Sequence, residues 1–319
     1  MSAEIFAEWL SAQGFTVVRT DSSYWCGISS RVYQAFPYSW VIDPPEEEIK
    51  DLLRKKGAIA LRYSTPLEKS FGRISYHTIF DKPSCSTETL PRKVRYSVLK
   101  GLQHVSCEAI PMKSLAFDGW ELRHQTLMRQ GRADAEKKEV WERMCLCADG
   151  LPGFEAWGAV HDGELVSSLL SYASDDCVSI LYQQSKTEHL KFGVNNALTF
   201  EFTRNVLLRP GVRCIFYGLH SLDAPPSVDE YKFRMGYTAK PVRQRVVFNP
   251  LIQPLVGQIS FGLLRRLLNV GRRNSITRKI EGVFQFYLQG RRPLIDQEWP
   301  EALSDQREAI LACDTGAAK

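Results

Sequence analysis

The order of elements between Phe154 and Phe248 constrains the fold of this chain more than any other feature. Three strand-like stretches come first, and Asp162-Gly163 between the first two is a strong hairpin signal. A helix, a strand, a second helix and a last strand follow. Antiparallel strands that lead into βαβ crossovers form a mixed sheet, so we predict a mixed α/β fold. The predicted strands are 154–161, 165–173, 177–184, 213–219 and 242–248, and the predicted helices are 194–208 and 228–235.

The residues before this region also alternate between helical and strand patterns. Pro44 and Pro45 precede three glutamates, which is typical of a helix start. From Pro250 onward the pattern becomes amphipathic and helical, and we expect the polar last twenty residues to be mobile. The further predicted helices are 3–13, 46–56, 89–104, 118–130, 134–149, 251–268 and 276–288, and the further strands are 15–19, 25–35, 58–63, 72–80 and 105–110.

Composition places the chain among ordinary globular proteins. It has 319 residues, a net charge of +5 and 44% hydrophobic residues, so its mildly basic balance is not that of a dedicated nucleic-acid binder. No run of about 18 apolar residues predicts a membrane span, and the N-terminus has no basic leader, so we expect a cytoplasmic protein.

Of the eight cysteines only Cys145 and Cys147 are close in the sequence, and this spacing is a poor signal for a zinc site. We expect reduced thiols and no metal.

Four segments carry a resemblance to a known family. Phe216–Ser221 is a strand that runs into a small-residue loop, and Tyr231-Lys232-Phe233-Arg234-Met235-Gly236 follows about ten residues later. Asn195–Leu198 opens the preceding helix, and a hairpin covers Gly158–Leu170. Together these segments resemble the Fem-type peptidyltransferases and related bacterial GNAT-like acyltransferases.

The resemblance implies two GNAT-like domains in tandem. Residues 1–105 would form a shortened first copy, and residues 106–250 the acyltransferase domain. Residues 251–319 would form a basic amphipathic helical extension with a mobile tail.

The segment before Asn195 departs from the usual acetyl-CoA motif. GNAT enzymes carry Arg/Gln-x-x-Gly-x-Gly/Ala, whose amides hold pyrophosphate at a helix N-terminus. Here the stretch is Leu190-Lys191-Phe192-Gly193-Val194-Asn195, with the basic residue displaced by one position and Asn in place of the last Gly. Gly193, Asn195 and Asn196 remain candidates to bind a phosphate or an acyl carbonyl, with helix capping as the alternative. Acyl-CoA is one expected donor, not tightly bound, and aminoacyl-tRNA is the donor that the resemblance implies.

Two neighbouring residues are the candidates for catalysis. The resemblance places Lys232 at the cleft, where its cation would stabilise negative charge on the acyl carbonyl during transfer. The alternative is a solvated lysine on a short helix. Tyr231 is a candidate proton donor, and simple packing is its alternative.

The remaining candidates would bind substrate. Tyr182 and Gln183 end the third strand, where we expect them to line a cleft between splayed strands. His220, with Asp223, follows the carboxyl end of another strand, although it is as readily an ordinary loop histidine. Arg92, Lys93 and Arg95 begin a basic helix suited to the phosphates of a nucleotide-sugar, a lipid carrier or tRNA, unless they form only a solvated face.

These features predict an N-acyltransferase that acts on a cell-envelope or polysaccharide precursor. The acceptor would be a small-molecule or lipid-linked amine, attacked without a covalent enzyme intermediate. Residues 261–292 contain eight basic residues and one acid, Glu281, and we expect them to contact an anionic membrane from the cytoplasmic side. The alternative is a non-catalytic GNAT-like module that binds a polysaccharide-assembly or membrane partner.

Overall fold

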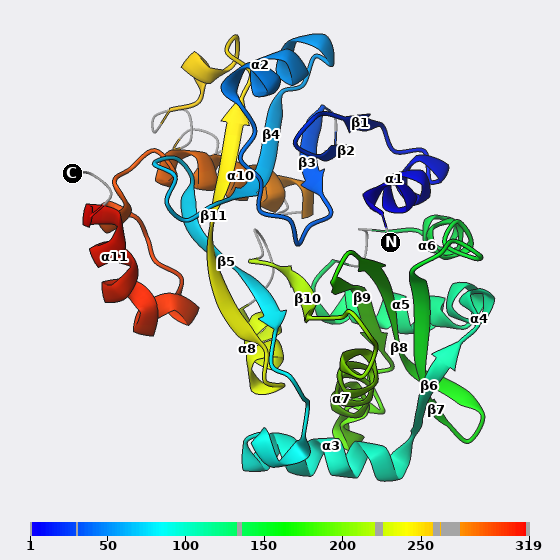
Figure 1. Ribbon diagram of the computed structural model, residues 1–319. Coiled ribbons are helices and arrows are strands. Elements are labelled where there is room, and N and C mark those ends of the chain that lie inside the picture. The colour runs from blue at the N-terminus through cyan, green and yellow to red at the C-terminus, as the bar shows by residue number, and fades with distance from the viewer. Residues whose placement is uncertain are drawn as a thin grey trace. The chain divides into compact units, whose positions relative to one another are not determined.

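The computed structural model describes residues 2–29, 31–132, 136–220, 226–257, 262 and 275–316 (Figure 1). The chain packs into two compact units built from segments that are far apart in the sequence. The expected boundaries at residues 105 and 250 stay a prediction, because compact packing does not test which segments fold alone. Unit 1 contains Met1–Gln13, Thr78–Gly218 and Ala224–Thr238, and unit 2 contains Gly14–His77, Leu219–Asp223 and Ala239–Lys319.

Unit 1 is built on strands in the order β10-β9-β8-β7-β6. Neighbouring strands from β6 to β9 are antiparallel, and β10 lies parallel to β9. Asp162 and Gly163 both have positive φ angles in the turn between β7 and β8, so the predicted hairpin is confirmed. The strands are β6 (Ser106–Ile110), β7 (Phe154–His161), β8 (Glu164–Ser174), β9 (Cys177–Ser185) and β10 (Cys214–Leu219).

Helices cover this sheet because their apolar faces need burial. Val98, Val194, Leu198 and Phe202 pack with Leu169 of β8 in one core. Figure 1 shows α3 beside α7 along this core. The helices are α1 (Ala3–Ala12), α3 (Arg92–His104), α4 (Met112–Phe117), α5 (Gly119–Arg129), α6 (Lys138–Leu146), α7 (Val194–Leu207) and α8 (Pro226–Arg234), with the 3-10 turns η1 (Thr87–Thr89) and η3 (Leu190–Phe192).

Unit 2 has strands in the order β1-β2-β3-β4-β11, with β3 parallel to β4 and β11 antiparallel to β4. The strand β5 (Arg73–Phe80) begins in unit 2 and ends in unit 1. The other strands are β1 (Val17–Arg19), β2 (Tyr24–Ser29), β3 (Val32–Phe36), β4 (Ala60–Thr65) and β11 (Thr238–Phe248). The helices are α2 (Glu46–Lys55), α10 (Ser275–Gln289) and α11 (Arg307–Gly316), with the 3-10 turns η4 (Gln253–Leu255), η5 (Leu294–Asp296) and η6 (Glu301–Gln306).

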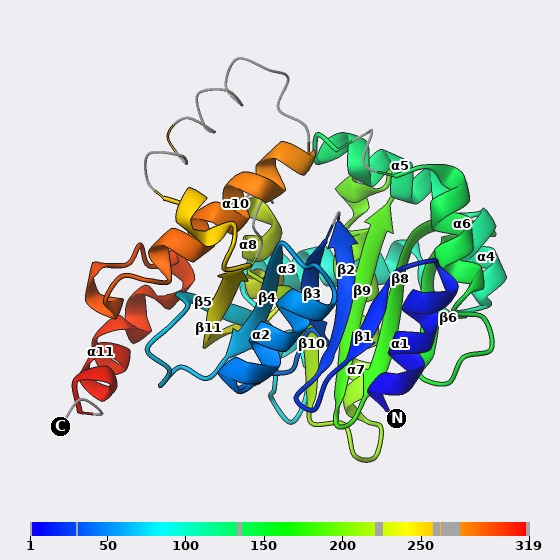
Figure 2. The ribbon, with the colours of Figure 1, turned by 90° about the horizontal axis from the view of Figure 1, so that it is seen from above.

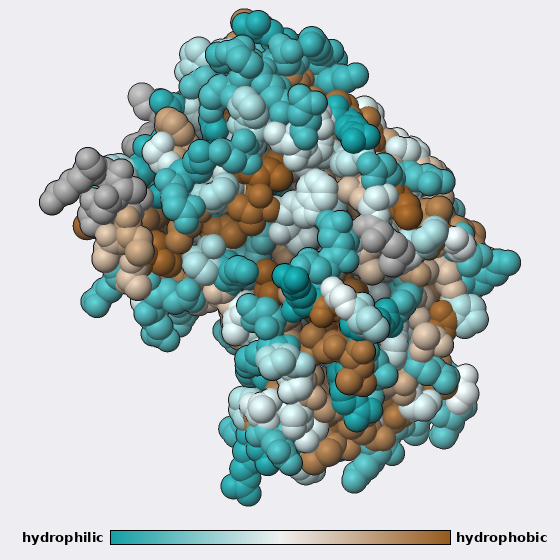
Figure 3. Space-filling model, in the orientation of Figure 1, coloured by the Kyte–Doolittle hydropathy of each residue, from teal (hydrophilic) through white to brown (hydrophobic). Residues whose placement is uncertain are grey.

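The helix α2 forms as its sequence predicts. It begins after Pro45, has three glutamates in its first turn and ends with Arg54 and Lys55. Ile49, Leu52 and Leu53 are buried and pack with residues of β2, β3 and β4, and Figure 2 shows α2 against β3 and β4. Its other face is charged, and the surface over α2 is hydrophilic in Figure 3.

Several parts of the chain differ from the sequence-based expectations. The helix predicted over 251–268 has only turns and η4 in its described residues 251–257, and α4 was not predicted. The single strand expected over 25–35 is a hairpin of β2 and β3, with Arg31 at a φ of 67° between them. The last twenty residues, which we expected to be mobile, contain η6 and α11. Within the described residues 300–316, Leu303 and Ile310 bury their side chains.

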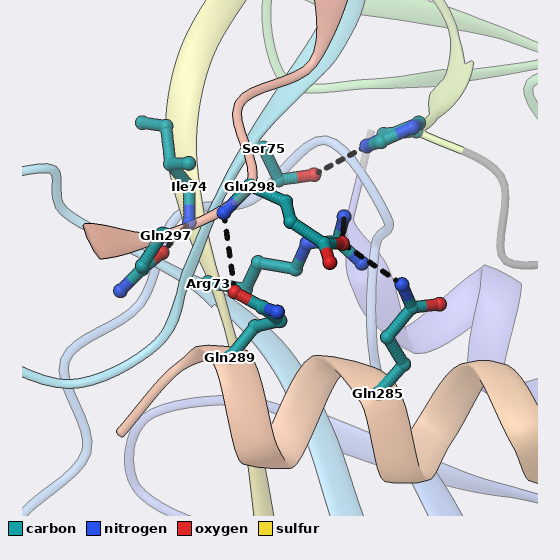
Figure 4. A network of polar contacts seen from close by, with 8 residues as sticks. Arg73, Ile74, Ser75, Gln285, Gln289, Gln297 and Glu298 are labelled. Carbon is teal, nitrogen blue, oxygen red and sulfur yellow. Dashed lines mark hydrogen bonds and ion pairs between the residues drawn. The ribbon is translucent and has the colours of Figure 1, made fainter. Parts of the chain in front are cut away.

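Gln297 attaches the C-terminal segment to unit 2 (Figure 4). Its side-chain Oε1 accepts a hydrogen bond from the Ile74 amide at 2.7 Å. Its Nε2 donates to the carbonyl oxygens of Gly72 at 3.3 Å and Arg292 at 2.9 Å. The amide side chain thereby pairs with the start of β5 as a neighbouring strand would.

Replacing Gln297 by alanine is expected to destabilise unit 2 by about 2–3 kcal/mol, because it removes the partner of the buried Ile74 amide and two further hydrogen bonds. Gln285→Ala is the control, since Gln285 donates only an exposed hydrogen bond to Glu298 and should cost less than about 0.5 kcal/mol. Urea unfolding of the two variants measures the difference. Equal losses would mean that Gln297 does not anchor this segment.

Candidate active site

The strands β9 and β10 pair only at their beginnings. Cys214, Ile215 and Phe216 are in register with Cys177, Val178 and Ser179. Beyond these three pairs β9 continues to Ser185 without pairing to β10. Parallel strands that separate at their carboxyl ends open a ligand site in α/β proteins, so this splay within unit 1 is the candidate site.

A polar network links β9, beyond its last pair with β10, to the helices α7 and α8. Tyr231 donates its hydroxyl to the Asn195 carbonyl at 2.9 Å and lies 2.8 Å from the Thr199 hydroxyl. The Gln183 Nε2 donates to the same Thr199 hydroxyl at 3.0 Å. Three of the predicted site residues, Gln183, Asn195 and Tyr231, are thus brought together. Thr199 was not anticipated, because a threonine in a helix gives no functional signal in the sequence.

Tyr231 is neutral in this network. Burial raises the pKa of its hydroxyl to about 12. At neutral pH it therefore stays a hydrogen-bond donor, and its proton is already engaged with the Asn195 carbonyl. The contact favours a positioning role for Tyr231, and the proton-donor role stays a prediction.

Lys232 is not a solvated lysine. Its side chain is 10% exposed, and its Nζ lies 2.7 Å from Oδ1 of Asp229, whose side chain is 12% exposed. The Nζ also lies 5.2 Å from the centroid of the Tyr217 ring, and a Cβ on Gly218 would meet it at 3.6 Å. A buried ion pair is costly to desolvate, so stability alone gives little reason to keep one at the end of β10.

Gly193 owes its identity to helix packing. It has a φ of +79° at the start of α7, and a Cβ there would lie 2.3 Å from the carbonyl oxygen of Ser97 in α3. Gly101 of α3 faces it in the same way, with a Cβ position 2.5 Å from the Gly193 carbonyl oxygen. The glycine that suggested a pyrophosphate loop is therefore explained by the close contact of α3 with α7.

The side chains of Asn195 and Asn196, which follow Gly193, make contacts within the protein. Oδ1 of Asn195 accepts from the Ser167 hydroxyl at 2.7 Å, and its Nδ2 donates to the Ser185 hydroxyl at 3.1 Å. Nδ2 of Asn196 lies 3.3 Å from the sulfur of Met235. The N-cap of α7 is Gly193, and the alternative role that we gave the two asparagines, capping this helix, does not appear among their side-chain contacts. The side chains of both asparagines are thus engaged within the protein, and their role in binding a phosphate or an acyl carbonyl stays a prediction.

Tyr182 lies on the other face of the sheet from Gln183, because successive strand residues alternate. Its ring lies 4.9 Å from the Arg123 guanidinium and 6.0 Å from the Trp141 ring. The structure therefore does not bring Tyr182 to the network of Gln183, and its role in binding substrate stays a prediction.

The three basic residues at the start of α3 have different surroundings. Arg92 and Lys93 are exposed, as a phosphate-binding surface requires. Arg95 instead donates to the carbonyl oxygens of Glu88 at 3.0 Å and Leu90 at 3.5 Å, where it holds the turn before the helix.

His220 belongs to unit 2. Its Nδ1 lies 3.3 Å from the Ser75 hydroxyl, and its ring stacks on Tyr76 at 4.6 Å. Asp223, which we paired with it, lies outside the described residues, as do Arg265, Arg266, Arg272 and Arg273 of the basic stretch. His220 remains a prediction as a substrate-binding residue.

A buried polar chain in unit 2 was missed from the sequence. Arg62 donates from Nε to Oε1 of Gln244 at 3.2 Å, and Gln244 donates from Nε2 to the Ser64 hydroxyl at 2.5 Å. Ser64 lies 2.7 Å from Nε2 of His77. Either Ser64 or His77 can donate in this contact, depending on the tautomer of the ring. Burial is the main cause that lowers the pKa of His77 to about 3.

The neutral state of His77 predicts acid sensitivity. The pKa of a histidine in the unfolded chain is near 6.5, whereas the pKa of His77 in the folded chain is about 3. Between these two pH values the unfolded chain binds a proton at His77 and the folded chain does not. The protonation of His77 in the unfolded chain is expected to lower the free energy of unfolding by about 1.4 kcal/mol for each pH unit from pH 6 down to pH 4. His77→Gln cannot take up that proton, so urea titrations at both pH values should show a shallower loss. Equal slopes in both proteins would contradict a buried neutral His77.

No group of three histidine, cysteine or carboxylate side chains among the described residues is arranged to hold a metal ion. Within the same residues no helix is long and apolar enough to cross a membrane.

Comparisons with known proteins show the fold. No protein-family model matches the sequence, and no curated protein matches it. The structure of FemX is similar with a TM-score of 0.52 at 12% identity, over 79% of this chain and 93% of that one. L-PGS from Bacillus licheniformis gives 0.51 at 11% identity, over 82% and 92%. The C-terminal domain (DUF2156) of a proposed lysylphosphatidylglycerol synthetase from Agrobacterium fabrum gives 0.51 at 11% identity, over 83% and 91%. The resemblance predicted from the sequence is thus confirmed at the level of the fold.

Proposed function

We propose that this chain, which has the Fem-type, GNAT-like acyltransferase fold, is an N-acyltransferase. It moves an acyl or aminoacyl group to an amine of a cell-envelope or polysaccharide precursor. The observation that carries the proposal is the buried Lys232–Asp229 pair at the carboxyl end of β10. The FemX and L-PGS likenesses support the fold on which this site rests.

Lys232 acts on the charge that develops during transfer. As the amine nitrogen bonds to the acyl carbon, the carbonyl oxygen becomes negative, and the lysine ammonium stabilises it. Asp229 holds the ammonium in place at 2.7 Å. The carbon–sulfur or carbon–oxygen bond of the donor then breaks, and the proton that the amine gives up passes to the leaving group, which departs as a thiol or hydroxyl.

The network around Tyr231 positions the donor. Gln183, Thr199 and Tyr231 fix the start of α7 relative to the splay through the Asn195 carbonyl. Preorganised donors and acceptors of this kind align a reacting carbonyl without reorganisation during the reaction. We propose Tyr231 and Gln183 as positioning residues for the acyl group.

The donor is an aminoacyl-tRNA in our primary proposal, with acyl-CoA as the alternative. The close packing of Ser97 against Gly193 explains that glycine without a phosphate, and the residue after Val194 is Asn rather than Gly. The exposed Arg92 and Lys93 offer phosphate contacts on α3. The same packing also favours the second candidate function, a non-catalytic module that binds an envelope-assembly or membrane partner.

Measurements of donor binding distinguish an aminoacyl-tRNA donor, an acyl-CoA donor and a non-catalytic module. Thermal unfolding is followed with acetyl-CoA, a long-chain acyl-CoA, free CoA and a pool of aminoacyl-tRNA. Stabilisation by aminoacyl-tRNA but not by deacylated tRNA supports the primary proposal. Stabilisation by the CoA species alone supports the alternative donor. No response to any of them, at concentrations where a known GNAT enzyme responds, would overturn both enzymatic readings.

We also propose that residues 261–292 contact an anionic membrane surface. Within the described part of that stretch, Arg291 and Arg292 are exposed after the amphipathic helix α10.

A further inference from the structure

Two of the eight cysteines are direct cross-strand neighbours. Cys177 begins β9 and Cys214 begins β10, and the two residues are register partners in the parallel pair. Their sulfur atoms are 2.8 Å apart, and both are thiols. Sequence spacing gave no hint of this pair, because 36 residues separate the two cysteines and they come together only through the parallel pairing of β9 and β10.

The backbone positions satisfy the requirements of a disulfide. Neighbouring strands lie about 4.7–4.9 Å apart, which is inside the range of about 4.4–6.8 Å that disulfides span between Cα atoms. Cys145 and Cys147 are the contrasting case. They lie two residues apart on α6 and its C-cap, where side chains face different directions.

We infer that Cys177 and Cys214 form a reversible disulfide that closes the base of the β9–β10 splay. The bond would enclose the loop that contains Gln183, Gly193, Asn195 and Thr199, and therefore the predicted donor side of the site. The inference does not rest on the proposed function, since it concerns the closed end of the two strands.

The chemistry requires an oxidant, which is a low-molecular-weight disulfide such as oxidised glutathione. Cys214 is half-buried and Cys177 is buried, so the oxidant reaches Cys214 first. The contact with Cys214 and burial both raise the pKa of Cys177, which makes it the poorer first nucleophile. The Cys214 thiolate attacks the oxidant and releases one thiol. The Cys177 thiolate then attacks the sulfur of Cys214 and releases the second thiol, so two protein thiols and one disulfide become one protein disulfide and two small thiols.

Intact-mass spectrometry of the full chain after incubation with oxidised glutathione tests this. We expect a loss of about 2 Da, two fewer alkylated cysteines after unfolding, and a cross-linked Cys177–Cys214 peptide, all reversed by dithiothreitol. The melting temperature is expected to rise by about 5–10 °C on oxidation.

Serine variants identify the pair. Cys214→Ser should abolish both the mass loss and the stabilisation, whereas Cys107→Ser, at a half-buried strand cysteine of unit 1, should keep both. A mass loss that persists in Cys214→Ser, a cross-link between other cysteines, or a glutathione adduct at Cys214 that never resolves would overturn the inference.

Discussion

Replacing Lys232 by methionine is expected to lower the rate of acyl transfer by about 10²–10³-fold, because a single preorganised donor at an oxyanion contributes about that factor. Methionine keeps much of the side-chain volume beside Tyr217 and removes only the cation. The loss should appear mainly in kcat, since the lysine acts on charge that develops in the transition state. Initial rates at saturating donor measure it.

The single variant leaves the buried Asp229 without its lysine, which costs stability. The double variant Asp229→Asn with Lys232→Met removes both charges and is expected to restore the melting temperature to within a few degrees of the natural protein. It should remain inactive. A stable double variant with full activity would show that the ion pair is structural only and would contradict the role of Lys232.

Replacing Gly193 by alanine is expected to destabilise unit 1 by about 3 kcal/mol or more. Its φ of +79° disfavours alanine by about 1–2 kcal/mol, and the new Cβ would meet the Ser97 oxygen at 2.3 Å. Either α3 or the start of α7 must move. Denaturant unfolding at neutral pH measures the loss.

Gly150 provides a matched control for the backbone angle. It also has a φ of +79°, but no atom lies within 4 Å of its Cβ position. Gly150→Ala should therefore cost only the backbone term of about 1–2 kcal/mol. If both alanine variants unfold at the same denaturant concentration, α3 does not pack on Gly193 as described.

The sequence predicted the second half of the fold well because its signals are local. Asp162-Gly163 specifies a hairpin, and the apolar spacing over 194–208 specifies a helix that the structure has as α7. The short strand pairs of unit 2 were harder. Arg31 turns the chain between β2 and β3 without a glycine or proline, so 25–35 was predicted as one strand.

The candidate site could be predicted only in part because it depends on pairing and side-chain direction. Lys232, Tyr231, Gln183 and Asn195 were found from motif and position, but Asp229 joined them only once α8 was seen to bury its polar pair. Tyr182 and Gln183 were predicted together, but they lie on opposite faces of the sheet, and the sequence did not indicate which face holds the network. The polar chain from Arg62 to His77 joins β4 and β5 through Gln244 of β11, which is 182 residues from Arg62 in the sequence.

The most direct test of the central claim is detection of the transferred group. The protein is incubated with aminoacyl-tRNA or acyl-CoA carrying a radiolabelled acyl group, together with amine-bearing envelope precursors. The product is treated with mild base, which cleaves thioesters and esters but leaves amides. We predict base-stable label on the precursor with the natural protein and background label with the stable Asp229→Asn, Lys232→Met variant. Equal base-stable label from both proteins would contradict a site at Lys232, and none from the natural protein with any donor would contradict N-acyl transfer itself.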